Sequence, residues 1–580
     1  MTEDVSAGQL LLDTLRASGV RYAFANFGSD HPSIIEALAA DRDRGITEPA
    51  VILCPHETTA LSAAHGYSVA TGEPTAVFVH TDVGTANLGG AVHNAARSRA
   101  PVFIFAGLTP FTLEGELPGT RNTHINHLQD VPDQHALVRQ YVKWSYDLRT
   151  ARNIPQVVRR GMQLALSAPA GPVYLTAARE VLAERVPWPS VPTDEHWPAI
   201  SLSPAPEETV ADLLTAIDRA TRAVVVTSYV GRNPAAVGHL VAAAEYLGLS
   251  VVEVNAEHVG FPADHHLHAG DDAHSLLDEA DVLIALDTDA PWLPSVRSPR
   301  PDATVAIVNE NPLQESIPLW YLPARHVIRA DAGRFLQQLL TAAQGVSIDP
   351  AQRSARIADA EQLHVATRAQ WANELSADRA SGRITAATVA STVDEIIDED
   401  AVVLNEAITE APTVWRHLTR IRPASLFGNR GTSLGWSGGG ALGVKLAMAG
   451  RPVVSIIGDG TFFLSVPSSS YWVADRYGIP VLTVVLDNGG WGATKRNLLR
   501  QYPDHTAQST DRYWVNLQQS ADFPGIAAAA GGAWGSTVDS LSELQTALSE
   551  ALSQIARGRA AIVVVKLDPI SDQHEDRLAG

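Results

Sequence analysis

The chain alternates short apolar runs with longer stretches whose apolar residues recur at helical spacing. Between about Gly8 and Thr176 the apolar runs are VRYAFANF, EPAVILCP, TAVFVHT, APVFIFAG and GPVYLTA. Short apolar runs separated by amphipathic helices are typical of βαβ units around a mainly parallel sheet. The pattern therefore predicts an α/β fold for the first part of the chain.

The same rhythm occurs twice more. The second stretch, 207–344, contains RAVVVTSYV, LSVVEVN, ADVLIALD and ATVAIVN, and the third contains DAVVLNE, RPVVSIIGDG, PVLTVVLDN and AAIVVVKLD. The first and third stretches are similar in length and rhythm, which predicts a duplicated topology. A Pro-rich passage at 186–206 is typical of a linker, and the charged, Ala-rich segment 351–380 favours a helix. We predict three doubly wound, mainly parallel-sheet domains: 1–185, 206–345 and 379–580.

Charge and composition narrow the possible partners. The 580 residues include 43 basic and 64 acidic side chains, a net charge of −21. This field repels nucleic acid and anionic membranes, so neither is an expected partner. The single cysteine, Cys54, cannot form an intrachain disulfide, the N-terminus lacks a basic signal-peptide start, and no apolar run reaches membrane-span length. The sequence predicts a cytoplasmic protein.

Two strand ends in the third stretch carry oxygen ligands. Segment 458–461, Gly-Asp-Gly-Thr, follows RPVVSII, and segment 488–490, Asn-Gly-Gly, follows PVLTVVL. Gly-Asp-Gly turns tightly, presents a carboxylate and opens a helix whose first N–H groups suit a phosphate. Mg²⁺ prefers oxygen ligands and completes its shell with phosphate oxygens and water. We predict a metal set of Asp459, Asn488 and the Gly490 carbonyl, with phosphate contacts at Gly458, Gly460 and Thr461.

Gly-Asp-Gly alone is often only a turn, but its spacing to Asn488 resembles the pattern of thiamine-diphosphate (ThDP) enzymes. The segment VILCPHETTALSAAHGYSVATGEP resembles the N-terminal Glu–Ala–Ala–Gly-Tyr–Thr-Gly pattern of that family, with Glu57 at the glutamate. The resemblance implies that Glu57 protonates N1′ of the aminopyrimidine, so that the 4′-imino group removes the thiazolium C2 proton. The cofactor then acts as a carbon nucleophile.

Further matches extend the resemblance through the first domain. The run from His80 through Gly84 to Asn87 resembles the family loop that ends in Gly-x-x-Asn and lines the site. Gln129 lies in a segment similar to Phe-Gln-Glu of acetolactate synthases. The resemblance implies catalytic roles for His80 and Gln129 and cofactor contacts for Gly84 and Asn87.

The third domain adds a cofactor loop. Segment 431–436, Gly-Thr-Ser-Leu-Gly-Trp, resembles the family's Gly-x-Met-Gly-Phe stretch. The resemblance implies that the Thr432 carbonyl accepts a hydrogen bond from the 4′-amino group. It also implies that the Leu434 side chain holds ThDP in its bent shape.

Three polar residues near these motifs have two interpretations. Segment 28–31, Gly-Ser-Asp-His, stands at the family's first strand-end loop but lacks the usual Pro-Gly-Gly. Asp30, His31 and His127 therefore either serve the site or are ordinary turn and cap residues.

Two departures from the family bear on the reaction. Segment 488–494 contains no acid, whereas enzymes similar to pyruvate decarboxylase carry a glutamate six residues after this Asn, so proton return needs water, a histidine or Thr494. This weakens simple decarboxylation relative to carboligation. Lys495 and Arg496, which follow instead, either attract a carboxylate or a CoA phosphate or lie in solvent. The run ADVLIALDTDAPWLP lacks the arginines of FAD-binding acetolactate synthases, so FAD is not predicted.

The resemblance implies an acetolactate-synthase-like enzyme that uses ThDP and Mg²⁺ to make or cleave a bond next to the carbonyl of a 2-oxo acid. It also implies a homodimer or homotetramer whose sites take Glu57 from one subunit and the metal motif from the other. One alternative is a 2-hydroxyacyl-CoA lyase acting on an acyl-CoA. Another is a catalytically idle ThDP-binding subunit, against which the combination of Glu57 with a full metal set counts.

Overall fold

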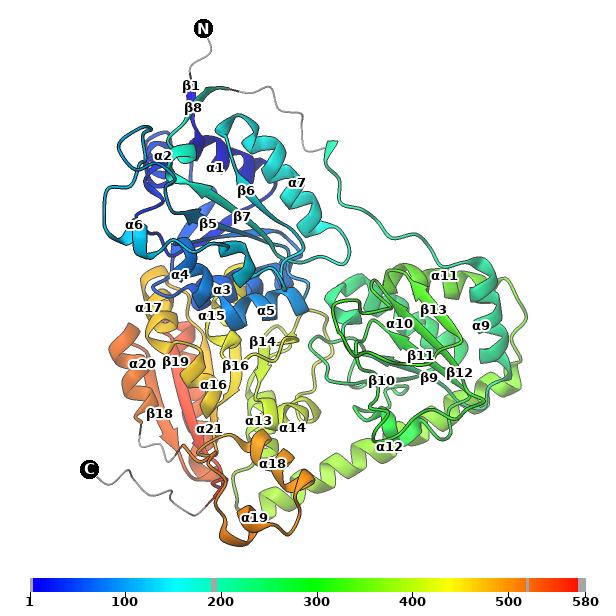
Figure 1. Cartoon of the computed structure of the whole chain (residues 1–580). Coiled ribbons are helices and arrows are strands. Elements are labelled where there is room, and N and C mark those ends of the chain that lie inside the picture. The colour runs from blue at the N-terminus through cyan, green and yellow to red at the C-terminus, as the bar shows by residue number, and fades with distance from the viewer. Residues whose placement is uncertain (1–3, 189–195, 518–520, 572–580) are drawn as a thin grey trace.

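The computed structural model describes residues 4–188, 196–517 and 521–571. Within them the chain forms three larger sheets, all parallel, in three units placed side by side (Figure 1). The helix α12 (Pro350–Ser381) runs from the middle unit to the C-terminal unit. No helix in these ranges is both long and apolar enough to span a bilayer.

The N-terminal unit has a six-stranded sheet in the order β3-β2-β4-β5-β7-β6. An antiparallel pair, β1 and β8, lies beside it. The strands are β1 (Asp4–Ser6), β2 (Tyr22–Ala25), β3 (Ala50–Leu53), β4 (Thr75–Val79), β5 (Val102–Leu108), β6 (Ser145–Leu148), β7 (Val173–Ala178) and β8 (Arg185–Pro187). The helices are α1 (Ala7–Ala17), α2 (Pro32–Asp43), α3 (Glu57–Thr71), α4 (Thr81–Asn87), α5 (Gly89–Arg97), α6 (Ile125–Leu128), α7 (Ile154–Leu166) and α8 (Arg179–Leu182).

The middle unit has a five-stranded sheet in the order β10-β9-β11-β12-β13. Its strands are β9 (Ala223–Thr227), β10 (Ser250–Glu253), β11 (Val282–Leu286), β12 (Thr304–Asn309) and β13 (His326–Arg329). Its helices are α9 (Glu207–Arg219), α10 (Pro234–Leu247) and α11 (Ala332–Gln344).

The C-terminal unit repeats the N-terminal topology, with the order β15-β14-β16-β17-β19-β18. Its strands are β14 (Val402–Glu406), β15 (Leu426–Gly428), β16 (Val453–Gly458), β17 (Leu482–Asp487), β18 (Trp534–Val538) and β19 (Ala561–Lys566). Its helices are α13 (Ala386–Ile396), α14 (Ala411–Arg416), α15 (Trp436–Ala447), α16 (Asp459–Leu464), α17 (Pro467–Tyr477), α18 (Gly492–Gln501), α19 (Thr506–Thr510), α20 (Phe523–Gly531) and α21 (Leu541–Ala556), with a short 3-10 turn, η6 (Ile408–Glu410).

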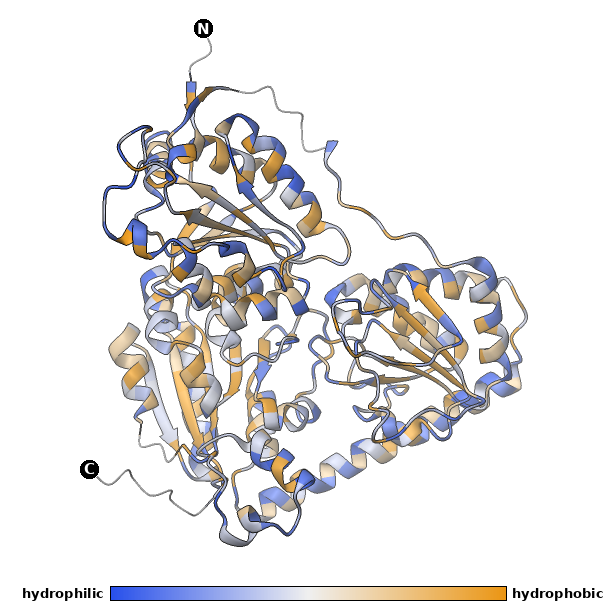
Figure 2. Cartoon of the chain, in the orientation of Figure 1, coloured by the Kyte–Doolittle hydropathy of each residue, from blue (hydrophilic) through white to orange (hydrophobic). Residues whose placement is uncertain are grey.

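The central strands are continuous apolar runs because helices cover both faces of each sheet. Figure 2 shows hydrophobic sheets between helices that are hydrophobic on one side and hydrophilic on the other. All five residues of β4, β9 and β11 are buried. The apolar periodicity read from the sequence is therefore the core of the fold.

The N- and C-terminal units are joined through α3 and α15, whose backbones touch at glycines. A Cβ on Gly443 would lie 1.9 Å from the Ala63 carbonyl oxygen, and one on Gly66 would lie 2.2 Å from that of Gly440. No larger residue fits without moving a helix, because interiors are close-packed. The glycine-rich run after the cofactor loop thus serves interdomain packing.

The predicted fold class and the duplicated topology are confirmed. The structure adds short strands that the apolar pattern did not indicate, among them β6, β13, β15 and β18. The domain ranges stay predictions, although each larger sheet falls within one of them. Residues 189–195 of the predicted linker lie outside the described residues.

Candidate active site

The N-terminal sheet brings three predicted or uncertain site residues to one edge. Glu57 follows β3, Asp30 follows β2, and His80 follows β4, and these strands are neighbours in the sheet. Carboxyl ends of parallel strands, near the point where strand order reverses, are where doubly wound folds bind ligands. The topology places acidic and basic side chains together there.

Glu57 is the first residue of α3 and is only 7% exposed. The Asn87 side-chain amide donates a hydrogen bond to Glu57 Oε2 at 3.0 Å. A Cβ on Gly84 would lie 3.3 Å from Glu57 Oε1, so this glycine lets the carboxylate approach closely. In this structure Gly84 and Asn87, predicted as cofactor contacts, surround and orient Glu57.

His80 is held between two oxygen-bearing side chains. Its Nδ1 lies 2.6 Å from Asp30 Oδ1, and its Nε2 lies 2.9 Å from Gln129 Oε1. The hydrogen bond to Asp30 raises the pKa of His80. Burial alone would raise the pKa of Asp30, but hydrogen bonds from His31 and His80 outweigh it and lower that pKa. The geometry favours an imidazolium opposite a buried carboxylate.

Small residues make this dyad possible. A Cβ on Gly28 would lie 2.2 Å from His80 Nδ1, and one on Gly107 would lie 1.8 Å from Asp30 Oδ2. His31 lies beneath, fully buried, with its ring beside those of Phe27 and Phe105. Asp30 therefore contacts the predicted site through His80, and His31 supports Asp30 from the core.

His127 lies apart from this dyad. It is exposed on α6, and its Nδ1 lies 3.3 Å from the Arg121 guanidinium. The structure thus brings Gln129 to His80 and leaves His127 at the surface.

In the C-terminal unit the carboxyl ends of β16 and β17 meet. Asp459 is 3% exposed and Asp487 is 4% exposed. Burial, together with the neighbouring Asp487 carboxylate, raises the pKa of Asp459 to about 7. Lys566 forms an ion pair with Asp487 from the adjacent strand β19. Two buried carboxylates with one lysine leave negative charge that a cation at Asp459 would offset.

The loop after β17 is closed by a hydrogen bond to the side chain of Asn488. The Gly490 amide donates to Asn488 Oδ1 at 3.1 Å, and the Gly490 carbonyl accepts from the Gly492 amide at 3.1 Å. Each acceptor oxygen keeps a second lone pair. The predicted metal set therefore lies on two adjacent strand ends, with oxygens still able to accept.

The residues predicted to contact phosphate are placed at the start of α16. Gly458 is extended at the helix N-cap, and the Gly460 amide donates to Asp459 Oδ1 at 2.8 Å. A Cβ on Gly460 would lie 2.2 Å from the Trp491 ring, so Trp491 closes over the turn. The Thr461 hydroxyl lies 3.4 Å from the Glu406 carbonyl, which ties the turn to β14.

The segment 431–433 is held from the N-terminal unit. The carbonyl of Gly431 lies 2.9 Å from His93 Nε2, and that of Ser433 accepts from the Asn94 amide at 2.8 Å. Thr432 between them is exposed, with φ at 56°, a strained value for a β-branched residue. Within the described residues no hydrogen-bond donor contacts the Thr432 carbonyl. The half-buried Leu434 follows.

Two family models match the chain. The model for the thiamine pyrophosphate enzyme N-terminal TPP binding domain matches residues 5–137, and the model for the C-terminal TPP binding domain matches residues 408–565. The chain belongs to the ThDP-dependent enzymes. Glu57 and His80 fall in the first match, and the cofactor loop and metal motif fall in the second.

Relatives with several reactions align over most of this ThDP enzyme. It is 25% identical to benzoylformate decarboxylase of Pseudomonas aeruginosa, over 83% of this chain and 86% of that one. It is 26% identical to the large subunit of acetolactate synthase isozyme 3 of Escherichia coli, over 98% and 95%. It is 25% identical to human 2-hydroxyacyl-CoA lyase 2, over 84% and 79%. The chain is thus an enzyme of the acetolactate synthase and decarboxylase superfamily.

The fold is also that of a solved relative. The structure of the ThDP-dependent 4-hydroxybenzoylformate decarboxylase of Rhodococcus jostii RHA1 superposes with a TM-score of 0.76 at 20% identity, covering 97% of this chain and 99% of that one. At this identity the likeness concerns the fold alone.

The residues present fit ThDP. A buried carboxylate for N1′, a carbonyl without a donor at Thr432, and a half-buried apolar side chain at Leu434 are the groups that an aminopyrimidine and a bent cofactor need. The Asp459 and Asn488 oxygens fit a hard cation. No cluster of three or more His, Cys, Asp or Glu with metal-binding geometry occurs in the described ranges, and an Asp, Asn and carbonyl set is not such a cluster.

Sequence reasoning missed two residues beside the ThDP motifs. Glu406, at the end of β14, accepts from the backbone amide of Ser437 at 2.8 Å and from Asn429 at 2.8 Å, and burial raises its pKa. Thr409 lines the same cavity as Asn488, and its side chain lies 3.4 Å from where a Cβ on Gly492 would be. The signal was available, because β14 ends in Asn-Glu at the same sheet edge as the metal motif.

Lys495 and Arg496 line a cavity of about 400 Å³ together with Thr409 and Asn488. Arg496 forms an ion pair with Glu410 at 2.9 Å. Lys495 is hydrogen-bonded to the Ile570 carbonyl and lies 4.3 Å from the Tyr513 ring centre. Both cations therefore have partners within the chain.

Proposed function

We propose that this chain uses ThDP and Mg²⁺ to make or cleave a carbon–carbon bond next to the carbonyl of a 2-oxo acid, in the manner of acetolactate synthases. The observation that carries the proposal is the Glu57 carboxylate, which is buried at the start of α3 and held by Asn87. Burying a carboxyl group costs free energy unless hydrogen-bonding partners offset the loss of water. An aminopyrimidine nitrogen is such a partner.

The chain's own residues divide the work. Glu57 holds a proton at N1′, the Thr432 carbonyl accepts from the 4′-amino group, and Leu434 keeps the cofactor bent. Asp459, Asn488 and the Gly490 carbonyl hold Mg²⁺ against the diphosphate. When bound, ThDP supplies a carbon nucleophile for the substrate carbonyl.

His80 is our candidate for returning a proton to the substrate. The segment after Asn488 offers no acid, whereas both ring nitrogens of His80 face oxygens of Asp30 and Gln129. With both nitrogens protonated, the ring is a proton donor whose charge Asp30 offsets. Gln129, whose Oε1 lies 2.9 Å from His80 Nε2, orients the ring.

We also propose that the enzyme works as a homodimer or homotetramer. Several large apolar side chains lie close in sequence to the proposed site residues and are exposed in the single chain. They are Val83 at 42%, Leu128 at 77%, Phe463 at 42% and Leu464 at 47%. Exposed apolar groups next to functional loops are typical of interfaces. A second copy covering them would complete a site between subunits.

A 2-hydroxyacyl-CoA lyase is the second candidate, and the aligned human lyase favours it. It requires cations free to bind CoA phosphates, and Lys495 and Arg496 already have partners. We therefore rank a 2-oxo acid above an acyl-CoA. An idle ThDP-binding subunit ranks last, because it has no use for the buried Glu57.

The test is turnover of a panel of 2-oxo acids and 2-hydroxyacyl-CoA esters with ThDP and Mg²⁺, with products identified by mass spectrometry. We expect product from 2-oxo acids, with turnover lowered by about 10²–10⁴-fold in the Glu57→Gln variant. Cleavage of the CoA esters alone would move the assignment to the lyase. Silence with every substrate, together with no ThDP binding, would overturn the proposal.

A further inference from the structure

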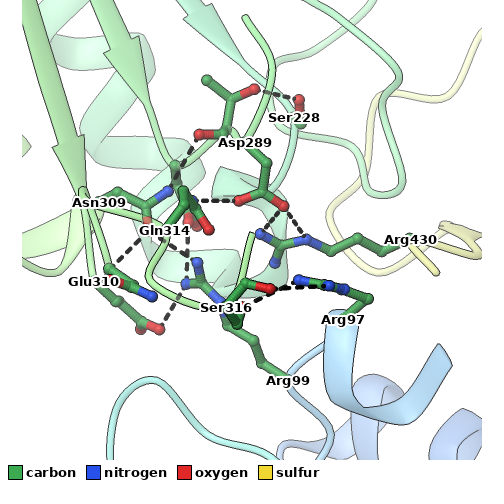
Figure 3. A network of polar contacts seen from close by, with 12 residues as sticks. Arg97, Arg99, Ser228, Asp289, Asn309, Glu310, Gln314, Ser316 and Arg430 are labelled. Carbon is green, nitrogen blue, oxygen red and sulfur yellow. Dashed lines mark hydrogen bonds and ion pairs between the residues drawn. The ribbon is translucent and has the colours of Figure 1, made fainter. Parts of the chain in front are cut away.

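The strand order of the middle sheet reverses between β9 and β11, and arginines from both other units contact residues that follow its strands at the carboxyl edge. In doubly wound folds this edge is the usual ligand site. Here Arg99 of the N-terminal unit is 2.8 Å from Glu310 and from Asn309. Arg430 of the C-terminal unit pairs with Asp289 (Figure 3). Two arginines of the chain itself, Arg99 and Arg430, therefore lie at the carboxyl edge of the middle sheet.

Arg430 is held on two sides by the middle unit. Its Nε donates to Asp289 Oδ2 at 2.7 Å, and a second guanidinium nitrogen reaches the same oxygen. Its guanidinium carbon lies 3.6 Å from the Tyr229 ring centre, a close cation–π contact. The side chain is 5% exposed. The Asp289 carboxylate binds the N–H edge of this planar, buried guanidinium and the Tyr229 ring packs against its face, which together fix its orientation.

Arg430 lies two residues before Thr432, whose carbonyl is the proposed 4′-amino acceptor. Within the same loop, the Asn429 side-chain amide donates to the Ser433 carbonyl at 2.8 Å. A strained φ at Thr432 persists only where the surroundings hold it. The neighbouring anchors are therefore part of what presents the carbonyl.

We propose that Arg430 is a positioning residue, through which Asp289 and Tyr229 of the middle domain hold the Thr432 carbonyl in place for the aminopyrimidine. This rests on the proposed function. It assigns the middle domain a role in the reaction although none of its residues is in the proposed cofactor set. If the contacts of Arg430 are lost, the loop can relax from the strained φ at Thr432. ThDP binding would then have to restore that conformation, which lowers the affinity.

The test compares two variants that each remove one carboxylate charge from the same network. Asp289→Asn keeps an oxygen for the Gln314 amide, which donates to Oδ1 at 2.7 Å, and turns an amide group toward Arg430. Glu310→Gln removes one of the two carboxylates next to Arg99, the other being Asp287, and leaves the contacts of Arg430 untouched. Calorimetry measures ThDP affinity with Mg²⁺ present, and thermal unfolding of the cofactor-free proteins measures stability.

We expect the ThDP Kd to rise about ten-fold in Asp289→Asn, as for loss of a charge-assisted hydrogen bond, and to stay within two-fold in Glu310→Gln. Both variants should lower Tm similarly. Equal ThDP affinity in Asp289→Asn and wild type, or equal weakening in both variants, would overturn the inference. Failure of the wild type to bind ThDP would overturn the proposed function and the inference with it.

A second pair of variants keeps the test decisive if Asp289→Asn does not fold. Tyr229→Phe retains the ring under Arg430 and should leave ThDP affinity unchanged. Tyr229→Leu removes the ring and should weaken ThDP binding several-fold. Equal affinities in this pair would show that the ring does not hold the loop.

Discussion

The N- and C-terminal units have the same strand order but place different chemistry at the same edge. Two topologically equivalent strands, β4 and β16, are followed directly by His80 and by Asp459. The N-terminal edge carries an acid–histidine dyad and Glu57, which are groups that hold and move protons. The C-terminal edge carries Asp459 beside Asn488, oxygens suited to a cation, and a tight turn.

The difference shows that the frame and the chemistry are separable. A parallel sheet delivers strand ends to one edge whatever residues occupy them, because helical crossovers align all strands. Function is then set by the few residues after each strand. The proposed proton-transfer groups lie in one unit and the proposed metal ligands in the other. A substitution at one edge should therefore leave the property that depends on the other edge unchanged enough to measure.

The largest expected effect is at the N-terminal edge. Glu57→Gln should lower turnover by about 10²–10⁴-fold, since a general acid–base group is lost. ThDP binding should change far less, because the metal edge is intact. Steady-state rates and calorimetry on the same preparation separate the two. Turnover at the wild-type level would contradict the assignment of Glu57.

The opposite pattern is expected at the C-terminal edge. Asp459→Asn removes the carboxylate of the metal set and should weaken Mg²⁺-dependent ThDP binding by about 10–100-fold or more. Calorimetry at several Mg²⁺ concentrations measures this. An unchanged dependence on Mg²⁺ would show that the ion, if bound, is held elsewhere.

Adding one methyl group at Gly443 tests the contact between α3 and α15, which joins the N- and C-terminal units. Gly443→Ala places a Cβ 1.9 Å from the Ala63 carbonyl and should cost about 1–3 kcal/mol of unfolding free energy. Gly450→Ala is the matched control, because no atom lies within 4 Å of its Cβ position. Urea denaturation compares the two. Equal stabilities would mean that α3 and α15 separate at little cost.

The smallest expected effect is a shift in a pH profile. Asp30 raises the pKa of His80, so the protonated donor is present at low pH and is lost as pH rises through that pKa. Asp30→Asn should move the falling limb of kcat/KM to lower pH, while the Gln129 hydrogen bond and the nearby Asp82 carboxylate still raise the pKa of His80. Stopped assays over a pH series measure it. A limb that stays in place would show that His80 is not the titrating donor.

Much of the fold was predictable from local pattern. The runs TAVFVHT and PVLTVVLDN are continuous apolar strands bounded by turn residues, so their burial follows from sequence. Strands such as β15 and β18 are short or half-polar edge strands, and pairing alone defines them. The amino-acid sequences of these two strands show no comparable apolar run.

The site divides in the same way. Asp459 and Asn488 could be proposed from their positions after apolar strands, and Glu57 from the resemblance of its segment to a family pattern, because both signals are local along the chain. The hold of Asp30 on His80 spans 50 residues and depends on Gly28 and Gly107, whose missing side chains make room for it. Such a contact is set by packing.

The sequence alone determined the cofactor family, the α/β class, the duplicated topology and the residues at the strand ends. The folded structure was needed to show which of the uncertain polar residues lie at the candidate site: Asp30 contacts His80, His31 lies behind Asp30, and His127 lies apart. It also decided that Arg430 anchors the cofactor loop to a different unit. Periodicity and spacing record short-range order along the chain, whereas the contacts that orient a side chain come from segments that only folding brings together.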